Sequence, residues 1–337
     1  MNSKFSVIIP LYNKAPYVRK ALDSIVSQTF RDWECIIVDD GSTDGSAAIC
    51  EEYLNNITPQ TSHILHQKNA GVAAARNRGV AESHGEYVCF LDADDWWEPM
   101  FLEEMDKLIK EYPDAGIYAS NYIYYKPGKT HVTLSLPRGY IDYPKAYYEG
   151  SAMPVWTGAT CMPRKVFDEM GGFPVGIKLG EDFLLWVKTA LHHPVAFSEK
   201  PLAYYNNDVP ASLRATRNLH APEHHMLFNF DSIEEEINRL QYTSNKAASW
   251  RMLLDKLRVS GLMDYWLDDR YHAAAATELN KVDWSMQPMS AKSQYERPIW
   301  LLKSKRRFMQ IGSFFKQRLI NFSPRLAVVL LHLKNRK

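Results

Sequence analysis

The sequence VCFLDADD, at residues 88–95, decides how the rest of the chain is interpreted. Its apolar start is typical of a strand buried on both faces of a sheet. Three carboxylates, Asp92, Asp94 and Asp95, follow with only Ala93 between them. Ligands bind at the carboxyl edge of open α/β sheets, and oxygen-rich clusters suit Mg²⁺ or Mn²⁺ shared with substrate phosphates. The other interpretation is a solvated acidic turn that caps the next helix, in which Asp95 is the candidate cap.

The chain has 337 residues, which is enough for one large domain with an appendage or for two domains. Apolar residues at 5–9 follow the first few residues and end at Pro10, so we expect no export signal. We also find no apolar run that approaches the ~18–20 residues needed to span a bilayer. The four cysteines are scattered without a C-x-x-C pair, so we expect buried free thiols in a reducing cytosol.

The net charge of +1 conceals an asymmetry along the chain. Residues 301–337 contain ten Lys or Arg and no Asp or Glu, out of totals of 40 basic and 39 acidic residues. Residues 1–300 therefore have a net charge of −9 and residues 301–337 one of +10. This contrast predicts that the basic segment has an anionic partner of its own.

Strand and helix patterns alternate through the first part of the chain. Apolar runs predict strands at 5–9, 33–38, 62–66, 87–91 and 115–125, and helical spacing predicts helices between them, as at 71–83 and 98–112. This alternation predicts a mostly parallel central sheet flanked by helices. Right-handed crossovers place successive strand ends on one edge, so Asp39 and Asp40 should meet the 92–94 acids there.

The alternation weakens after about residue 127. Gly180, Glu181 and Asp182 then predict a helix start with two acids in its first turn, and 220–285 read as helical. We therefore expect an α/β domain at 1–215, a C-terminal helical extension at 216–300 and a basic amphipathic tail at 301–337.

The first strand is followed neither by G-x-G-x-x-G nor by a Walker-type phosphate loop. The motifs present resemble those of the family 2 glycosyltransferases, inverting enzymes with the GT-A fold, in the family's order and at its usual spacing over roughly residues 4–210. The motifs are VIIPLYN (7–13), SQTF (27–30), ECIIVDDGSTD (34–44), NAGVAAARN (69–77), GEYV (85–88), LDADD (91–95), GGF (171–173) and GED (180–182).

The resemblance implies a nucleotide-sugar site. Asp39 would accept a hydrogen bond from the nucleotide base, with Asp40 nearby on the nucleoside. Pro10, Tyr12 and Asn13 would line the base and ribose side. The alternative to nucleotide binding is that Asp39 and Asp40 only cap the following helix.

The remaining implied roles concern the reacting groups. Asp92 would contact the ribose with Ala93 beside it, Asp94 would ligate Mn²⁺ or Mg²⁺, and Asp182 would be the catalytic base. Arg76 is either a phosphate or base-side contact or a surface helix residue. A divalent ion stabilises the charge on a diphosphate leaving group, and a carboxylate takes the proton of the attacking hydroxyl.

Two alternatives concern neighbouring residues. Glu181 and Asp182 are also what a first helical turn prefers electrostatically, and Glu181 is a weaker candidate for the base. Trp156 and Trp186 could stack an acceptor sugar, with core packing as the equal alternative.

One departure from the family pattern affects the diphosphate. The family often has an aromatic-Arg pair where this chain has YYN at 204–206, so a basic contact there is in doubt. Arg214 or Arg217 could replace it.

The resemblance therefore implies a metal-dependent transferase that moves a sugar, most often from a UDP-sugar in similar enzymes, to a glycan or lipid-linked glycan in bacterial-type surface polysaccharide biosynthesis. The alternative is a non-catalytic nucleotide-sugar-binding or assembly protein that keeps the fold. For the basic tail we favour a cytoplasmic protein held peripherally on the inner face of the cell membrane. A tail docked on the catalytic domain is the other possibility, and we expect no nucleic-acid partner.

Overall fold

The computed structural model describes residues 3–57, 62–150, 152–210, 219–299 and 302–303. Its contacts divide the chain into two compact units, Met1–Lys256 and Leu257–Lys337. The boundary expected at residue 215 lies outside the described residues. The division into 1–215, 216–300 and 301–337 therefore stays a prediction.

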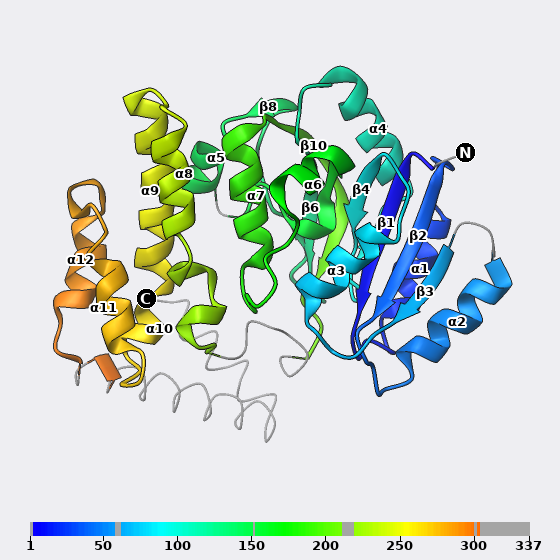
Figure 1. Ribbon diagram of the computed structural model, residues 1–337, viewed down its shortest axis with the longest axis horizontal. Coiled ribbons are helices and arrows are strands. Elements are labelled where there is room, and N and C mark those ends of the chain that lie inside the picture. Colours follow the sequence, from blue (N-terminus) through cyan, green and yellow to red (C-terminus); the bar gives the residue numbers. More distant parts are fainter. Residues whose placement is uncertain (1–2, 58–61, 151, 211–218, 300–301, 304–337) are drawn as a thin grey trace. The chain divides into compact units, whose positions relative to one another are not determined.

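One sheet forms the centre of the first unit (Figure 1). Its strands are β1 (Phe5–Leu11), β2 (Trp33–Asp39), β3 (Ser62–His66), β4 (Tyr87–Phe90), β5 (Trp96–Trp97), β6 (Ile117–Tyr125), β7 (His131–Val132), β8 (Gly139–Ile141), β9 (Thr160–Pro163) and β10 (Val195–Asn206). The order across the sheet is β3-β2-β1-β4-β9-β6-β10-β5, with β7 beside β6 and β8 beside β10.

The parallel part of the sheet is the part that the sequence predicts. Strand β1 is parallel to β2 and β4, and β2 is parallel to β3. Strands β1 and β2 are buried almost throughout, as two-sided burial requires. The predicted α/β class with a parallel sheet core is confirmed.

The first strand is longer than expected, because it continues through Pro10 to Leu11. The Leu91 amide donates to the Ile8 carbonyl, so the nitrogen of every second residue of β1 faces β4. Strand β4 ends at Phe90, before it reaches the level of Pro10. A proline is tolerated there because its missing N–H has no strand to pair with.

The other half of the sheet contains strands that the sequence analysis did not identify. Strand β9 runs antiparallel between β4 and β6, and β5 pairs antiparallel with β10. Strands β5 and β9 have only two and four residues. Strand β10 shifts its register around Pro201, which interrupts its alternation. These features hide the strands from a periodicity argument.

Helices cover both faces of this sheet (Figure 1). Helix α3 (Val72–Ala81) packs closely on one face, because a Cβ added to its Gly79 would lie only 2.5 Å from Ile8 and 3.2 Å from Val38. On the other face Leu22 lines a small cavity with Cys35. The described helices that begin in the first unit are α1 (Val18–Val26), α2 (Ser46–Ile57), α3 (Val72–Ala81), α4 (Phe101–Glu111), α5 (Tyr143–Glu149), α6 (Arg164–Met170), α7 (Glu181–His192), α8 (Asp231–Arg239) and α9 (Ser244–Gly261), with 3₁₀ turns η1 (Thr157–Ala159), η4 (Pro222–His224) and η5 (Met226–Phe228).

The second unit is helical in its described residues. It contains the end of α9, then α10 (Met263–Trp266), α11 (His272–Leu279), η6 (Trp284–Met286) and α12 (Met289–Glu296). Arg258 is fully buried in it and donates from Nε to Glu278 at 3.0 Å. The Tyr295 ring packs edge-on against Trp266. The predicted helical character of 220–285 agrees with this unit and with α8 and α9.

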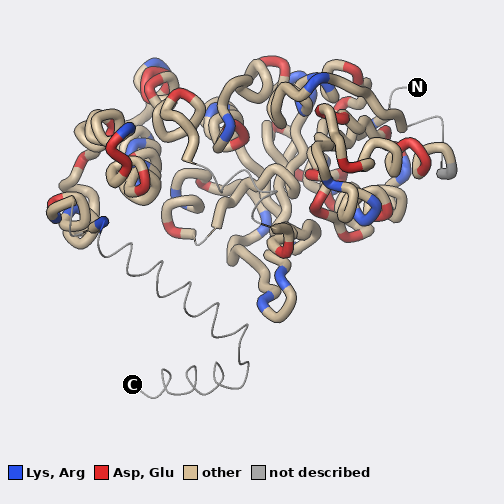
Figure 2. Tube along the Cα trace, turned by 90° about the horizontal axis from the view of Figure 1, so that it is seen from below, with Lys and Arg blue, Asp and Glu red and all other residues tan. Residues whose placement is uncertain are grey.

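Two further expectations concern thiols and membrane spans. All four cysteines are free and buried, as predicted. Within the described ranges, no helix combines the length and apolarity that crossing a membrane requires. Basic and acidic residues are interspersed along this part of the chain (Figure 2). The basic segment lies outside the described residues except for Leu302 and Lys303.

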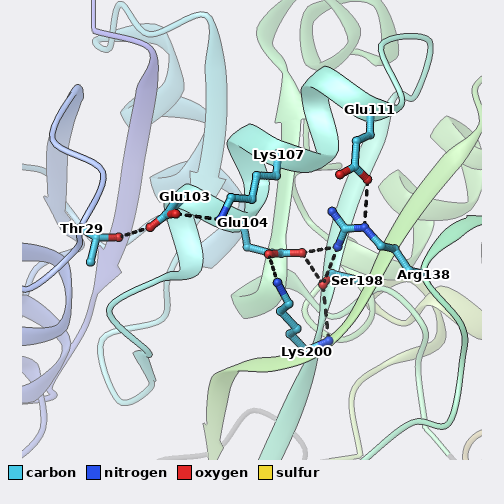
Figure 3. A network of polar contacts seen from close by, with 8 residues as sticks. All are labelled: Thr29, Glu103, Glu104, Lys107, Glu111, Arg138, Ser198 and Lys200. Atoms are coloured by element: carbon cyan, nitrogen blue, oxygen red, sulfur yellow. Dashed lines mark hydrogen bonds and ion pairs between the residues drawn. The ribbon is translucent and has the colours of Figure 1, made fainter.

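A buried carboxylate ties α4 to β10. The Glu104 side chain is 1% exposed and accepts from Lys200 Nζ at 2.7 Å and from Ser198 Oγ at 2.8 Å (Figure 3). Arg138 also contacts it and pairs with Glu111 at 2.9 Å. Burial alone would raise the pKa of Glu104, but these donors more than offset it and lower the pKa to about 2.

This network predicts an acid-dependent stability. The folded pKa of Glu104 lies below its ordinary 4.5, so its contribution is complete above pH 4.5 and is lost as the pH falls towards 2. Replacing Glu104 by Gln should lower the free energy of unfolding by about 3 kcal/mol at pH 7. Urea unfolding from pH 7 to 2.5 should show this deficit shrinking with acid. The control Glu103→Gln removes the more exposed acid beside it, and an equal effect there would contradict the prediction.

Candidate active site

The carboxyl ends of β2 and β4 lie on the same edge of the sheet. Both strands are parallel to β1, which lies between them. Two strand spacings separate their ends by about 10 Å. The predicted convergence of Asp39 with the 92–94 acids on one edge follows from this pairing, without a direct contact between them.

Asp39 is buried at the end of β2, with 5% of its surface exposed. Its Oδ1 accepts from the Ser42 amide at 3.0 Å, and its Oδ2 lies 3.1 Å from His66 Nδ1. The carboxylate is thus fixed by the β2–α2 turn and by the end of β3. The helix-capping alternative is wrong for Asp39, because Asp44 accepts the amide of Ser46, where α2 begins.

Asp40 holds the loop that leads into α3. It is 3% exposed, and its two oxygens accept from Gln67 Nε2 and from the amides of Ala70 and Gly71 at 2.8–2.9 Å. It therefore does not cap α2 either. A contact of Asp40 with the nucleoside stays a prediction.

The loop after β1 presents one aromatic ring to solvent. Tyr12 is 49% exposed, and Asn13 adopts a left-handed φ of 52° that Asn tolerates better than most residues. Asn13 donates its amide to Ser42 Oγ at 3.1 Å and accepts from the Thr43 amide at 2.8 Å. The β1–α1 and β2–α2 loops are therefore pinned together at the strand edge, beside Pro10. This placement fits the predicted base and ribose side.

The three acids after β4 each have a different partner. Arg76 Nη2 donates to Asp92 at 2.7 Å, Lys14 Nζ to Asp94 at 2.5 Å, and the Asn206 amide to Asp95 at 2.7 Å. Asp95 therefore braces β10, and its interpretation as a helix cap is wrong, since α4 begins only at Phe101. Ala93 between them is buried.

Burial and neighbouring charges shift the pKa values of two of these acids. Burial raises the pKa of Asp94; Lys14 opposes this shift and Asp92 adds to it. Burial, Asp94 and Asp92 raise the pKa of Asp95 well above its ordinary value. The strand end thus carries more acid than its own cations neutralise.

Arg76 lies at the centre of the site rather than on a helix surface, so the surface alternative is wrong. It is 3% exposed and bridges Asp92 at 2.7 Å and Glu181 at 2.9 Å. Burial alone would lower the pKa of Arg76, but Asp92, Glu181 and Asp182 outweigh it and raise that pKa. The next residue, Asn77, exchanges two hydrogen bonds with the backbone of Phe173. Helix α3 thereby joins the end of β4 to the start of α7.

The first turn of α7 supplies the candidate base. Asp182 Oδ2 accepts from Thr157 Oγ1 at 2.7 Å, and Oδ1 accepts the Phe183 amide at 2.8 Å. Burial and Asp182, against Arg76, raise the pKa of Glu181 to about 7. The sequence analysis missed Thr157, since nothing in a short 3₁₀ turn marks it.

The aromatic residues near these acids pack in the core. Trp186 is 1% exposed against Phe90 and Phe173, and Trp156 is 6% exposed beside Tyr205. Core packing is therefore confirmed for both tryptophans.

Two lysines contact the segment that follows β4, although the aromatic-Arg pair of the family is missing. Tyr204 stacks on Trp96 with centroids 4.8 Å apart, and Lys20 Nζ lies 3.0 Å from the Trp96 ring centroid. Lys14 adds a second ammonium. Neither lysine was singled out from sequence, since a lysine in a loop or helix has no motif of its own. Arg214 and Arg217 lie outside the described residues.

The carboxylate oxygens at this strand end fit a divalent ion that is shared with the phosphates of a bound substrate. Across the described ranges, no three His, Cys, Asp or Glu side chains gather to hold a metal alone. Asp94 nevertheless already accommodates a cation, the Lys14 ammonium, against one oxygen. One carboxylate plus donor phosphates is an ordinary ligand set for Mg²⁺.

Comparison with known proteins assigns the fold and the family. The model of glycosyl transferase family 2 matches residues 6–171, and this part of the chain belongs to that family. Glycosyltransferase GlyA of Streptococcus pneumoniae is 44% identical over 124 residues, which are 36% of this chain and 17% of GlyA. The chain spans 17 to 48% of the length of three such relatives.

Two comparisons with solved structures support the fold. S. aureus TarS 1-349 in complex with UDP-GlcNAc superposes with a TM-score of 0.69 at 20% identity, covering 86% of this chain and 83% of TarS 1-349. Mannosyltransferase PcManGT from Pyrobaculum calidifontis in complex with GDP-Man and Mn²⁺ gives 0.53 at 17% identity, covering 100% and 89%. The predicted GT-A fold is confirmed.

The Arg76 bridge predicts a large effect on stability. Arg76→Met leaves the buried carboxylate of Glu181 and the partly exposed one of Asp92 without their cation, so the free energy of unfolding should fall by about 3–5 kcal/mol. Arg76→Lys should recover only part of this loss, because one ammonium cannot reproduce the planar two-sided contact. Urea unfolding at pH 7.5 measures both. The control Arg78→Met, on the same helix, loses hydrogen bonds to the His66 carbonyl and to Gln67 Oε1, both from one nitrogen, and should cost about 1 kcal/mol. Equal losses at 76 and 78 would contradict the bridge.

Proposed function

We propose that this protein is a metal-dependent inverting glycosyltransferase that moves a sugar from a nucleotide-diphosphate sugar to an acceptor hydroxyl. The observation that carries the proposal is the meeting of two acidic segments. The 92–94 acids follow β4, and Arg76 links Asp92 to Glu181 in the helix turn that also bears Asp182. Family membership of residues 6–171 supports the same class of reaction.

Asp182 is the proposed general base. Thr157 and the Phe183 amide each use one lone pair of its two oxygens, which leaves others for a substrate proton. As the acceptor oxygen bonds to the anomeric carbon, its proton passes to Asp182. The bond from that carbon to the diphosphate breaks on the opposite face, and its electron pair leaves with the nucleoside diphosphate. Attack opposite the leaving group inverts the anomeric configuration.

The base and the diphosphate of the donor would be bound by residues at the ends of β2 and β4. Asp39, which is fixed from two sides, would accept a hydrogen bond from the base, and Tyr12 is exposed beside the same pair of loops. Asp94 would hold Mn²⁺ or Mg²⁺, which when bound supplies Lewis-acid stabilisation of the leaving diphosphate. PcManGT is described with GDP-Man and Mn²⁺, and TarS with UDP-GlcNAc. A uridine diphosphate sugar is the first donor to test, and the proposed acceptor is a glycan or lipid-linked glycan of a bacterial-type surface polysaccharide.

Turnover tests the base. We expect Asp182→Asn to slow Mn²⁺-dependent release of UDP from a UDP-sugar by about 10²–10⁴-fold, because the amide cannot take the proton. Donor affinity and melting temperature should change little. Mass spectrometry of the products measures the rate.

The matched control is Asp231→Asn, which removes an acid from the first turn of α8 instead. An unchanged rate in Asp182→Asn would refute the assignment. A wild-type protein that binds UDP-sugars without any turnover would favour the non-catalytic alternative.

We further propose that the basic segment 301–337 holds the protein peripherally at an anionic membrane surface. Its charge of +10 supports this, since basic residues near anionic lipid contribute about 1 kcal/mol each. Reversing Lys305, Arg306 and Arg307 to Glu in the full chain should weaken binding to phosphatidylglycerol vesicles by at least about tenfold. Co-sedimentation with neutral phosphatidylcholine vesicles is the control. Unchanged binding to the anionic vesicles would contradict the proposal.

A further inference from the structure

The ion pair between Lys14 and Asp94 joins two loops far apart in sequence. Lys14 Nζ lies 2.5 Å from Asp94 Oδ2, and the two side chains are only 16% and 17% exposed. Water screens such a pair less than one on an open surface. The contact therefore neutralises much of the charge of Asp94.

The three acids after β4 differ in how easily their partners can leave. Asp92 pairs with the guanidinium of Arg76, which is itself buried and held by a second carboxylate. Asp95 accepts a hydrogen bond from the backbone amide of Asn206. Asp94 alone among the three pairs with a lysine ammonium on a four-carbon stem. The partner of Asp94 is thus a flexible side chain, whereas that of Asp95 is strand backbone and that of Asp92 is held by a second carboxylate.

The backbone that carries this lysine is fixed. The Lys14 amide donates to Ser46 Oγ at 3.2 Å, and the Ala15 amide donates to Asp44 Oδ2 at 2.9 Å. The Lys14 carbonyl accepts from the amides of Tyr17 and Val18, where α1 starts. The fixed backbone keeps the ammonium within reach of Asp94, and the four-carbon stem is the flexible part of the residue.

We propose that Lys14 is a resident counter-cation of the donor site that competes with the divalent ion for Asp94. This inference rests on the proposed function, in which Asp94 holds Mn²⁺ or Mg²⁺. Without donor, the ammonium neutralises the carboxylate and keeps the strand end compact. A divalent ion that takes the same oxygen must displace the ammonium, because two cations at one carboxylate repel each other. Lys14 therefore weakens metal binding to the free protein and favours binding together with the donor, whose diphosphate adds negative charge.

Direct metal binding tests this competition. Titration of the full-length protein with Mn²⁺, followed by the electron paramagnetic resonance signal of the free ion, gives the dissociation constant without any turnover. Lys14→Met should lower that constant by roughly tenfold, the effect of one removed neighbouring charge. Lys14→Arg keeps the charge and should bind Mn²⁺ about as weakly as the wild type. Thermal unfolding of each variant checks that it is folded.

The matched control is Lys20→Met, which removes an ammonium from the same region that lies over the Trp96 ring and not on Asp94. An equal gain in Mn²⁺ affinity in Lys20→Met and Lys14→Met would overturn the proposal. The gain would then come from the lower positive charge of the region and not from removal of a competitor at Asp94. Equal, measurable constants in the wild type and Lys14→Met would also overturn it, while leaving the metal site intact. No Mn²⁺ binding in any variant would instead overturn the metal site on which it rests. Mn²⁺ bound only when UDP is added, equally in both proteins, would again refute the competition.

Discussion

The rest of the site depends on one buried guanidinium. Arg76 reaches Asp92 at the end of β4 and Glu181 at the start of α7, and these contacts join a strand end to a helix 89 residues further along the chain. The next residue, Asn77, makes a second connection between α3 and the segment before α7, through two hydrogen bonds with the backbone of Phe173. Desolvating this charge is costly, and the carboxylates around it recover the cost only while the geometry holds. The position of the first turn of α7 relative to the acids after β4 is therefore set by α3.

The site is also built with an excess of acid. The two cations Lys14 and Arg76 face carboxylates at positions 92, 94, 181 and 182, and burial raises the pKa of Asp94 and of Glu181. Such a site attracts cations and repels a bare diphosphate. A divalent ion paired with a nucleotide diphosphate would be attracted by the acids and would offset the repulsion of the diphosphate. This electrostatic balance supports the proposed metal-assisted transfer more directly than any single residue does.

The sequence predicted the parts of this arrangement that follow from periodicity. Buried apolar runs that alternate with helices predict that β1, β2 and β4 run parallel, and parallel strands place Asp39 and Asp92 on one edge of the sheet. What it could not predict depends on contacts between distant segments. Whether Arg76 faces solvent or the core depends on how α3 packs on the sheet. The acceptor for Lys14 and the donor to Asp182 come from loops with no periodic signal. Strand β9 is too short to be recognised, so its antiparallel insertion beside β4 appears only in three dimensions.

The central claim is that the carboxyl edge between β2 and β4 binds a nucleotide diphosphate and a divalent ion together. A crystal structure of the full-length protein with UDP and Mn²⁺, with anomalous data collected at the manganese edge, tests it most directly. The account predicts one anomalous peak against the Asp94 carboxylate, the uracil against Asp39, and the Lys14 ammonium away from Asp94. A nucleotide seated elsewhere, or a manganese peak with no contact to Asp94, would contradict it.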